Sequence, residues 1–134
     1  MGARHDPLTG RITHQGQFSE GAFLAGTFFR EDGVQFMGRF QDELGHDTEM
    51  EIVYLGGVTF HGEVVHGRPV VGFLTYPDGR VISGIVEHIT STGVATMQLE
   101  IRGETKFLAG GHTVGKSAFD AYVRELRRRR SSAS

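Results

Sequence analysis

Apolar and polar residues alternate along several short stretches of the chain. In residues 34–40 (VQFMGRF) and again in residues 58–64 (VTFHGEV), every second position carries a large apolar side chain or a glycine. A period of two is typical of a β-strand that buries one face and exposes the other. These stretches therefore predict a mainly β protein built from short strands.

Glycine occurs at regular intervals and accounts for 20 of the 134 residues. One series lies within the predicted strands, at positions 16, 38, 62, 84 and 110. A second series marks predicted turns at positions 33, 57, 79 and 103, and a third lies at positions 21, 45, 67 and 93. The shared period of about 23 residues indicates an internal repeat and a stacked architecture.

The turn glycines stand in local sequences that favour tight reversals. Asp32-Gly33 and Asp78-Gly79 place glycine where the backbone needs a positive φ, which a residue without a Cβ adopts at low cost. Each repeat is thus predicted to be a β-hairpin that is stabilised by stacking on its neighbours. The strand glycines are expected to avoid a collision with an aromatic ring of the next repeat.

The best-defined repeat contains Phe60-x-Gly62, Gly67, Gly72 and the segment LTYPDG at residues 74–79. This pattern resembles the MORN (membrane occupation and recognition nexus) repeat family, and weaker copies extend the resemblance over residues 11–110. The usual first tyrosine is replaced at His14, Phe36, Phe60 and Ile82. The family's His-Gly-x-Gly element is missing. The resemblance implies one curved antiparallel sheet of hairpins and a role in protein interaction, dimerisation or lipid association.

The chain ends in a predicted amphipathic helix at residues 116–130. Ser117 and Asp120 resemble a capping box, and an apolar stripe follows at Phe119, Tyr122, Val123 and Leu126. This stripe is expected to cover the open end of the hairpin array. The chain then divides into an N-terminal segment (1–10), the repeats (11–115), the helix (116–130) and a tail (131–134).

Charge is distributed unevenly, although the formal net charge is only −2. Residues 31–51 hold seven acidic side chains against one arginine, whereas the C-terminal helix is basic. The candidate partner-binding or anion-binding residues are Lys116, Arg124, Arg127, Arg128, Arg129 and Arg130. They predict a protein partner, a second copy bound through its acidic strand, or anionic lipid. Nucleic acid is not expected, because the basic run is short and the pI is about 6.4.

The segment GGHTVGKS at residues 110–117 matches the phosphate-binding pattern G-x-x-x-x-G-K-S. Nucleotide binding would use Gly110, Gly115, Lys116 and Ser117, with the lysine on the phosphates and the serine on Mg²⁺. That fold requires parallel strands covered by helices, whereas the chain predicts antiparallel hairpins. The segment is therefore interpreted as the junction between a fifth repeat, to which Gly110 belongs, and the helix. Nucleotide binding remains an alternative.

Other candidate chemistry is sparse. The chain has no cysteine, its seven histidines lack metal-ligand spacing and are expected in solvent or turns, and Glu49 and Glu51 are expected on the solvent face of a strand. No catalytic residue, metal or cofactor is predicted. The predicted function is a non-enzymatic binding or scaffolding module. In the absence of a long apolar segment, the module is expected in the cytoplasm or peripherally at a membrane.

Overall fold

The computed structural model describes the backbone at residues 2–40 and 47–133, and the side chains of these residues except 47, 48 and 130–133. Within these residues, eleven strands form one open, curved antiparallel sheet that is followed by a C-terminal helix. The predicted fold class, a single sheet of successive hairpins with one terminal helix, is confirmed.

The strands are β1 (Gly2–His5), β2 (Ile12–Ser19), β3 (Ala22–Phe29), β4 (Gln35–Arg39), β5 (Asp47–Val53), β6 (Thr59–Val65), β7 (Arg68–Thr75), β8 (Val81–Ile89), β9 (Ala95–Ile101), β10 (Glu104–Ala109) and β11 (His112–Val114). A short 3-10 helix, η1 (Leu55–Gly57), separates β5 from β6, and the terminal helix is α1 (Lys116–Ala133).

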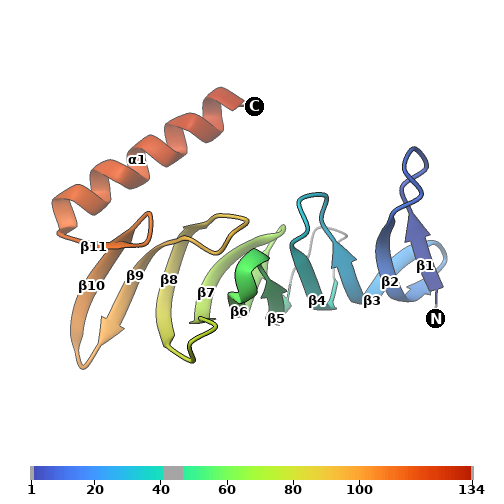
Figure 1. Ribbon diagram of the computed structural model, residues 1–134, viewed down its shortest axis with the longest axis horizontal. Coiled ribbons are helices and arrows are strands. Elements are labelled where there is room, and N and C mark those ends of the chain that lie inside the picture. The colour runs from blue at the N-terminus through green and yellow to red at the C-terminus, as the bar shows by residue number, and fades with distance from the viewer. Residues whose placement is uncertain (1, 41–46, 134) are drawn as a thin grey trace.

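Each strand pairs with the strand that follows it in the chain, so the sheet has the simplest possible topology (Figure 1). The strands run from β1 at one end of the molecule to β11 at the other, and α1 lies above the β8–β11 end in this view. The prediction that residues 1–10 lie outside the array is wrong for β1. This strand pairs with β2, with Gly2 opposite Gly16, and so gives the backbone of β2 a hydrogen-bonding partner.

One face of the sheet forms the hydrophobic core. The alternating residues Val34, Phe36, Ile52, Phe60 and Leu74 are each no more than 2% exposed. Full burial of a side chain of this size contributes about 1.5–3 kcal/mol to folding. In β6, β7 and the first part of β8, the residues of opposite parity form the outer face, where the candidate site lies.

The sheet curls around its core far enough for two distant turns to meet. The backbone N–H of Leu55, which follows β5, donates a hydrogen bond to the carbonyl oxygen of Ser91, which follows β8, over 2.9 Å. Beside this bond, Gly93 packs so closely on Val58 that an added Cβ would lie 2.6 Å from the valine Cβ. The Leu55–Ser91 bond therefore closes the loops over the core, although the sheet itself remains open.

The predicted Asp-Gly turns form as expected. Gly33 and Gly79 have φ values of 97° and 91°, in the region that glycine adopts without strain. The preceding aspartates stabilise the turns, because Asp32 Oδ1 accepts the Val34 N–H at 3.2 Å and Asp78 Oδ1 accepts the Arg80 N–H at 2.9 Å. Gly45 of the third glycine series lies outside the described residues.

The strand glycines face one another across the sheet. Gly16 pairs with Gly26, which pairs with Gly38, and further along Gly62 pairs with Gly72, which pairs with Gly84. A Cβ added to Gly72 would lie 2.4 Å from the carbonyl oxygen of His61 and 2.9 Å from Cζ of Phe60. A side chain at position 72 would therefore collide with the aromatic ring, as expected, but its closer contact would be with the backbone of the facing strand.

The C-terminal junction differs from the prediction in three respects. Gly110 lies in the turn between β10 and β11, with φ of 55°, and is therefore not the strand glycine of a fifth repeat. Ser117 lies inside the first turn of α1 rather than at its N-cap, and Asp120 pairs with Lys116 Nζ over 2.9 Å instead of completing a capping box. The helix also continues to Ala133, because no proline or glycine stops it after Arg130.

Candidate interaction surface

The outer face of the sheet carries a continuous row of paired residues. Glu63 of β6 faces Val71, which faces Ile85, which faces Gln98, which faces Phe107 of β10. Directly opposed residues of antiparallel strands project from the same face. The row therefore joins the part of the outer face that α1 covers to a part that no described element covers.

The covered part lies beneath α1. The Phe119 ring packs 5.0 Å, between centroids, from the Phe107 ring, and Phe119 and Val123 are only 5% and 6% exposed. Half of the predicted stripe thus binds the sheet, as expected for a covering helix, whereas Tyr122 stays 39% exposed. Amphipathic burial of this kind is what holds a surface helix in place.

The uncovered part is an apolar patch on β7 and β8. Its members are Val71, Phe73, Val81 and Ile85, with exposed fractions of 41%, 55%, 55% and 49%. A contiguous group of exposed large apolar side chains is typical of an interaction site. We call these four residues the outer patch.

A shallow groove of about 340 Å³ borders the outer patch. Gly62 and Gly72 contribute to its lining together with His61, Val71 and Phe73. The groove is acidic on its β5–β6 side, where Glu49 and Glu63 line it and the exposed Glu51 pairs with His61. The surface therefore combines apolar side chains with negative charge.

The acidic strand prediction is confirmed in part. Glu49 and Glu51 are exposed, while Met50 and Ile52, which alternate with them, are fully buried. Asp42, Glu43 and the side chain of Asp47 lie outside the described residues. Asp32 is engaged with Arg30, whose guanidinium lowers the pKa of this carboxyl below its ordinary value.

The outer patch was not predicted from the sequence, although the sequence contains a signal for it. Residues 69–74 (PVVGFL) and 81–86 (VISGIV) carry apolar side chains at both parities of the strand, unlike residues 58–64. Strands that are apolar on both faces are normally covered on both faces. The inward face of β7 and β8 is buried in the core, so the outward apolar residues lack such a cover within the described chain.

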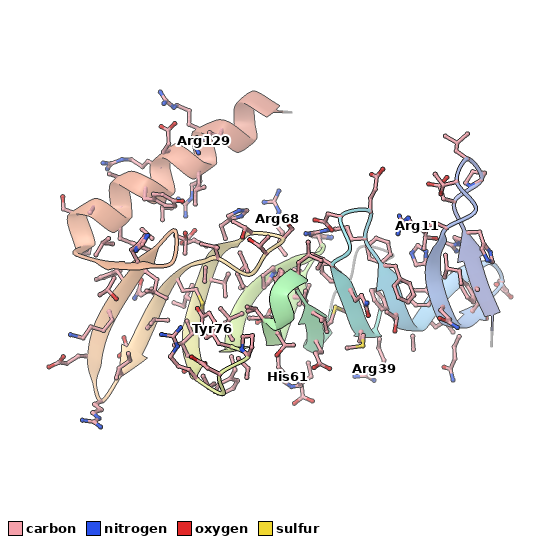
Figure 2. The ribbon with its side chains drawn as sticks, viewed as in Figure 1. Arg11, Arg39, His61, Arg68, Tyr76 and Arg129 are labelled. Atoms are coloured by element: carbon pink, nitrogen blue, oxygen red, sulfur yellow. The ribbon has the colours of Figure 1, made fainter. Side chains whose placement is uncertain are left out.

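The basic residues of α1 are partly neutralised within the chain. Arg127 reaches Glu87 of β8 at 3.2 Å, and Arg128 and Arg129 reach Glu125 at 2.6 and 3.3 Å. The Arg128 contact is the main cause that lowers the pKa of Glu125. Arg124 is exposed on the helix, and the side chain of Arg130 lies outside the described residues. Figure 2 places Arg129 above the sheet.

The GGHTVGKS segment forms a β-hairpin rather than a phosphate loop. Gly110 and Gly111 make the turn, and residues 112–114 pair antiparallel with residues 107–109. The Gly110 N–H donates to Thr96 Oγ1 at 3.0 Å, and Lys116 is engaged by Asp120. The four predicted nucleotide-binding residues are therefore not arranged around a common phosphate position, because a strand lies between Gly110 and Lys116.

His14 is an exception to the expected solvent exposure of the histidines. It is 7% exposed and lies 4.9 Å from the Phe23 ring and 4.8 Å from the Phe28 ring, between centroids. His14 thus occupies the place of the first aromatic residue of a repeat, as the repeat alignment implied. Across the described ranges 2–40 and 47–133, no three His, Asp or Glu side chains gather in a way that could hold a metal ion.

The helices of the described chain are too short or too polar to span a membrane. No protein-family model, curated protein or solved structure matches the chain.

Proposed function

We propose that the chain is a non-enzymatic, MORN-like binding or scaffolding module that mediates protein–protein interaction through its outer face. The observation that carries this proposal is the outer patch, in which four large apolar side chains stay between 41% and 55% exposed on a regular sheet. The removal of such exposed apolar area from water by a partner is favourable and would stabilise the complex. The MORN-like repeat pattern supports the same class of function.

The partner that fits is a protein segment with apolar and basic side chains. The groove beside the patch places the Glu63 carboxylate next to Val71 and Phe73. Carboxylates at the border of an apolar site favour positive charge in the partner and speed its approach.

The packing of α1 supports the proposal that this face binds an amphipathic basic helix. α1 packs Phe119 on Phe107, and Arg127 of the same helix pairs with Glu87. Phe107 belongs to the same outer row as Ile85 and Val71. A partner helix of similar chemistry would therefore lie beside α1 and extend the cover over β7 and β8.

The proposal is tested with a fluorescent peptide of residues 115–133 as a representative basic amphipathic helix, followed by fluorescence anisotropy. Substitution of Phe73 and Ile85 by serine is expected to weaken peptide binding by about tenfold or more, since two large apolar contacts are lost. The control is Leu24→Ser, at a residue on β3 that is 44% exposed and lies outside the patch. Equal affinity in all three proteins would refute the proposal.

The same variants test self-association. Sedimentation velocity of the wild-type chain is expected to show a monomer, because the apolar stripe of α1 is occupied by its own sheet. A dimer that dissociates when Phe73 and Ile85 are replaced would instead assign the outer patch to a second copy.

A membrane-surface adaptor is a second candidate function, favoured by the exposed arginines of α1. Arg124, Arg128 and Arg129 are exposed, with side-chain exposures of 75% and 71% for the last two. Phe119 and Val123 are buried and cannot insert into a membrane in this arrangement. Attraction of α1 to anionic lipid would therefore be purely electrostatic.

A further inference from the structure

A second concavity lies where the curl of the sheet brings distant segments together. It has a volume of about 220 Å³, and its lining includes Arg30 before β4, Tyr54 after β5, Arg68 at the start of β7, and residues 87–89 of β8. None of these residues lines the groove beside the outer patch. Arg68 lies at the margin of the sheet nearest to α1 in Figure 2. We call this concavity the curl pocket.

Tyr54 gives the curl pocket a hydroxyl group. The residue is only 4% exposed, and no hydrogen bond joins its hydroxyl to any described residue. Burial raises the pKa of this phenol above its ordinary value, while the nearby Arg30 charge opposes the rise. The hydroxyl therefore remains a neutral donor that an acceptor group of a ligand in the pocket can engage.

Arg30 is held in a fixed orientation at the pocket. Its Nε and Nη2 donate to the two carboxylate oxygens of Asp32 at 2.9 and 2.7 Å, and its guanidinium lies 5.6 Å from the centre of the Phe36 ring. A bidentate and stacked guanidinium loses little further freedom when it binds an anion.

The charges around the pocket leave an excess of one positive charge. Arg30 is balanced by Asp32, and Glu87 is balanced by Arg127 at 3.2 Å. The remaining lining cation is Arg68, which has no ion-pair partner among the described residues. A single negative charge is therefore the charge that the site would neutralise.

We propose that the curl pocket binds a small organic carboxylate. The carboxylate would receive hydrogen bonds from Arg68 and the Tyr54 hydroxyl, and its apolar part would lie against Pro69 and Ile89, which also line the pocket. The volume lies below the range typical of drug-sized ligands, which limits the ligand to a small molecule. This site does not depend on the outer patch, so either proposal can fail without the other.

The test is an amide NMR titration with sodium benzoate at constant ionic strength, with neutral benzamide as the matched ligand. Benzoate is expected to give saturable shifts at Gly67 and Ile89, whereas benzamide and inorganic phosphate are not. Arg68→Gln should weaken benzoate binding about tenfold or more, and Tyr54→Phe about fivefold, as expected for a charged and a neutral hydrogen bond. Arg102→Gln, at an exposed turn arginine, should bind like the wild type.

Three results would overturn the proposal: equal binding of benzamide and benzoate, a titration of Arg68→Gln identical to the wild type, or saturation by phosphate without saturation by benzoate. Arg68 is exposed, so its replacement leaves the core intact and the test stands even if Tyr54→Phe alters packing. The absence of saturable benzoate shifts would likewise refute the site.

Discussion

At the scale of single residues, the sheet depends on two different uses of glycine. In the strands, Gly62 and Gly72 let two backbones approach at a point where a Cβ would meet the facing chain at 2.4 Å. In the turns, Gly79 meets nothing within 4 Å, and its role is to adopt a φ of 91°. The first use is steric and the second is conformational, so the two should respond differently to substitution.

Replacement by alanine separates these two roles. Gly79→Ala is expected to lower the free energy of unfolding by about 1–2 kcal/mol, the cost of a left-handed backbone with a Cβ. Gly72→Ala, where φ is ordinary, is expected to lower it by about 3 kcal/mol or more, because the facing backbone must move. Urea denaturation of both variants measures the difference. A Gly72→Ala protein at least as stable as Gly79→Ala would contradict the steric account.

Tyr54 predicts a loss of stability at alkaline pH. Burial raises its pKa in the folded state, so above about pH 10 the unfolded chain releases this proton while the folded chain retains it. The stabilising contribution is fully present below pH 10 and is lost as pH rises, by at most about 1.4 kcal/mol per pH unit. Tyr54→Phe should flatten this dependence in denaturation curves measured between pH 9 and about pH 11. An unchanged slope would show that the phenol ionises in the folded protein.

The residue-scale features were only partly predictable from sequence. The turn glycines followed from Asp-Gly dipeptides, since the turn geometry is local. Gly26, the partner of Gly16, was not identified, because the pairing depends on strand register that the spacing did not reveal. His14 was expected in solvent, and its burial between Phe23 and Phe28 follows from its place in the repeat rather than from its residue type.

At the scale of elements, α1 depends on two buried side chains. Most of the stability of a helix in a protein comes from packing of its apolar face, so the order of this 18-residue helix relies on the burial of Phe119 and Val123. The ion pair between Arg127 and Glu87 is largely exposed on the arginine side and adds little.

Phe119→Ala is therefore expected to release the helix without unfolding the sheet. Loss of the Phe107 contact should speed tryptic cleavage at Arg124 by about tenfold or more, since the opening free energy falls by more than 1.4 kcal/mol. Tyr122→Ala is the matched control, because Tyr122 remains 39% exposed, and it should be cleaved at close to the wild-type rate. Similar cleavage of both variants would show that the buried stripe does not anchor α1.

The helix was predictable as an element, whereas the hairpin before it was not. Its apolar spacing determined both its existence and its buried side. The GGHTVGKS motif suggested a loop, but Gly110 and Gly111 both have positive φ and form a tight turn, so His112–Val114 becomes a strand. The candidate interaction surface was likewise missed, because exposure of Phe73 and Ile85 depends on where α1 stops covering the outer face.

At the scale of the whole molecule, the charges of α1 predict weak membrane association. Exposed arginines gain about 1 kcal/mol each near an anionic surface, but Arg128 and Arg129 already share Glu125. Vesicles with about 30% phosphatidylserine should therefore retain the protein at low salt and release it at about 0.15 M ionic strength. Co-sedimentation that persists at about 1 M salt would contradict this, since it would require insertion of apolar side chains.

The contact between Leu55 and Ser91 bears on how such an array can change in length. In most repeat arrays each unit touches only its neighbours, so units can be gained or lost by duplication and deletion. An extra hairpin inserted between β6 and β8 would move the two turns apart by about 9.6 Å, the width of two strands. The hydrogen bond between the Leu55 N–H and the Ser91 carbonyl would then be lost, together with the packing of Gly93 against the Val58 side chain. Duplications are therefore compatible with this fold on the β1–β4 side, whereas the span from β5 to β9 has a fixed number of strands.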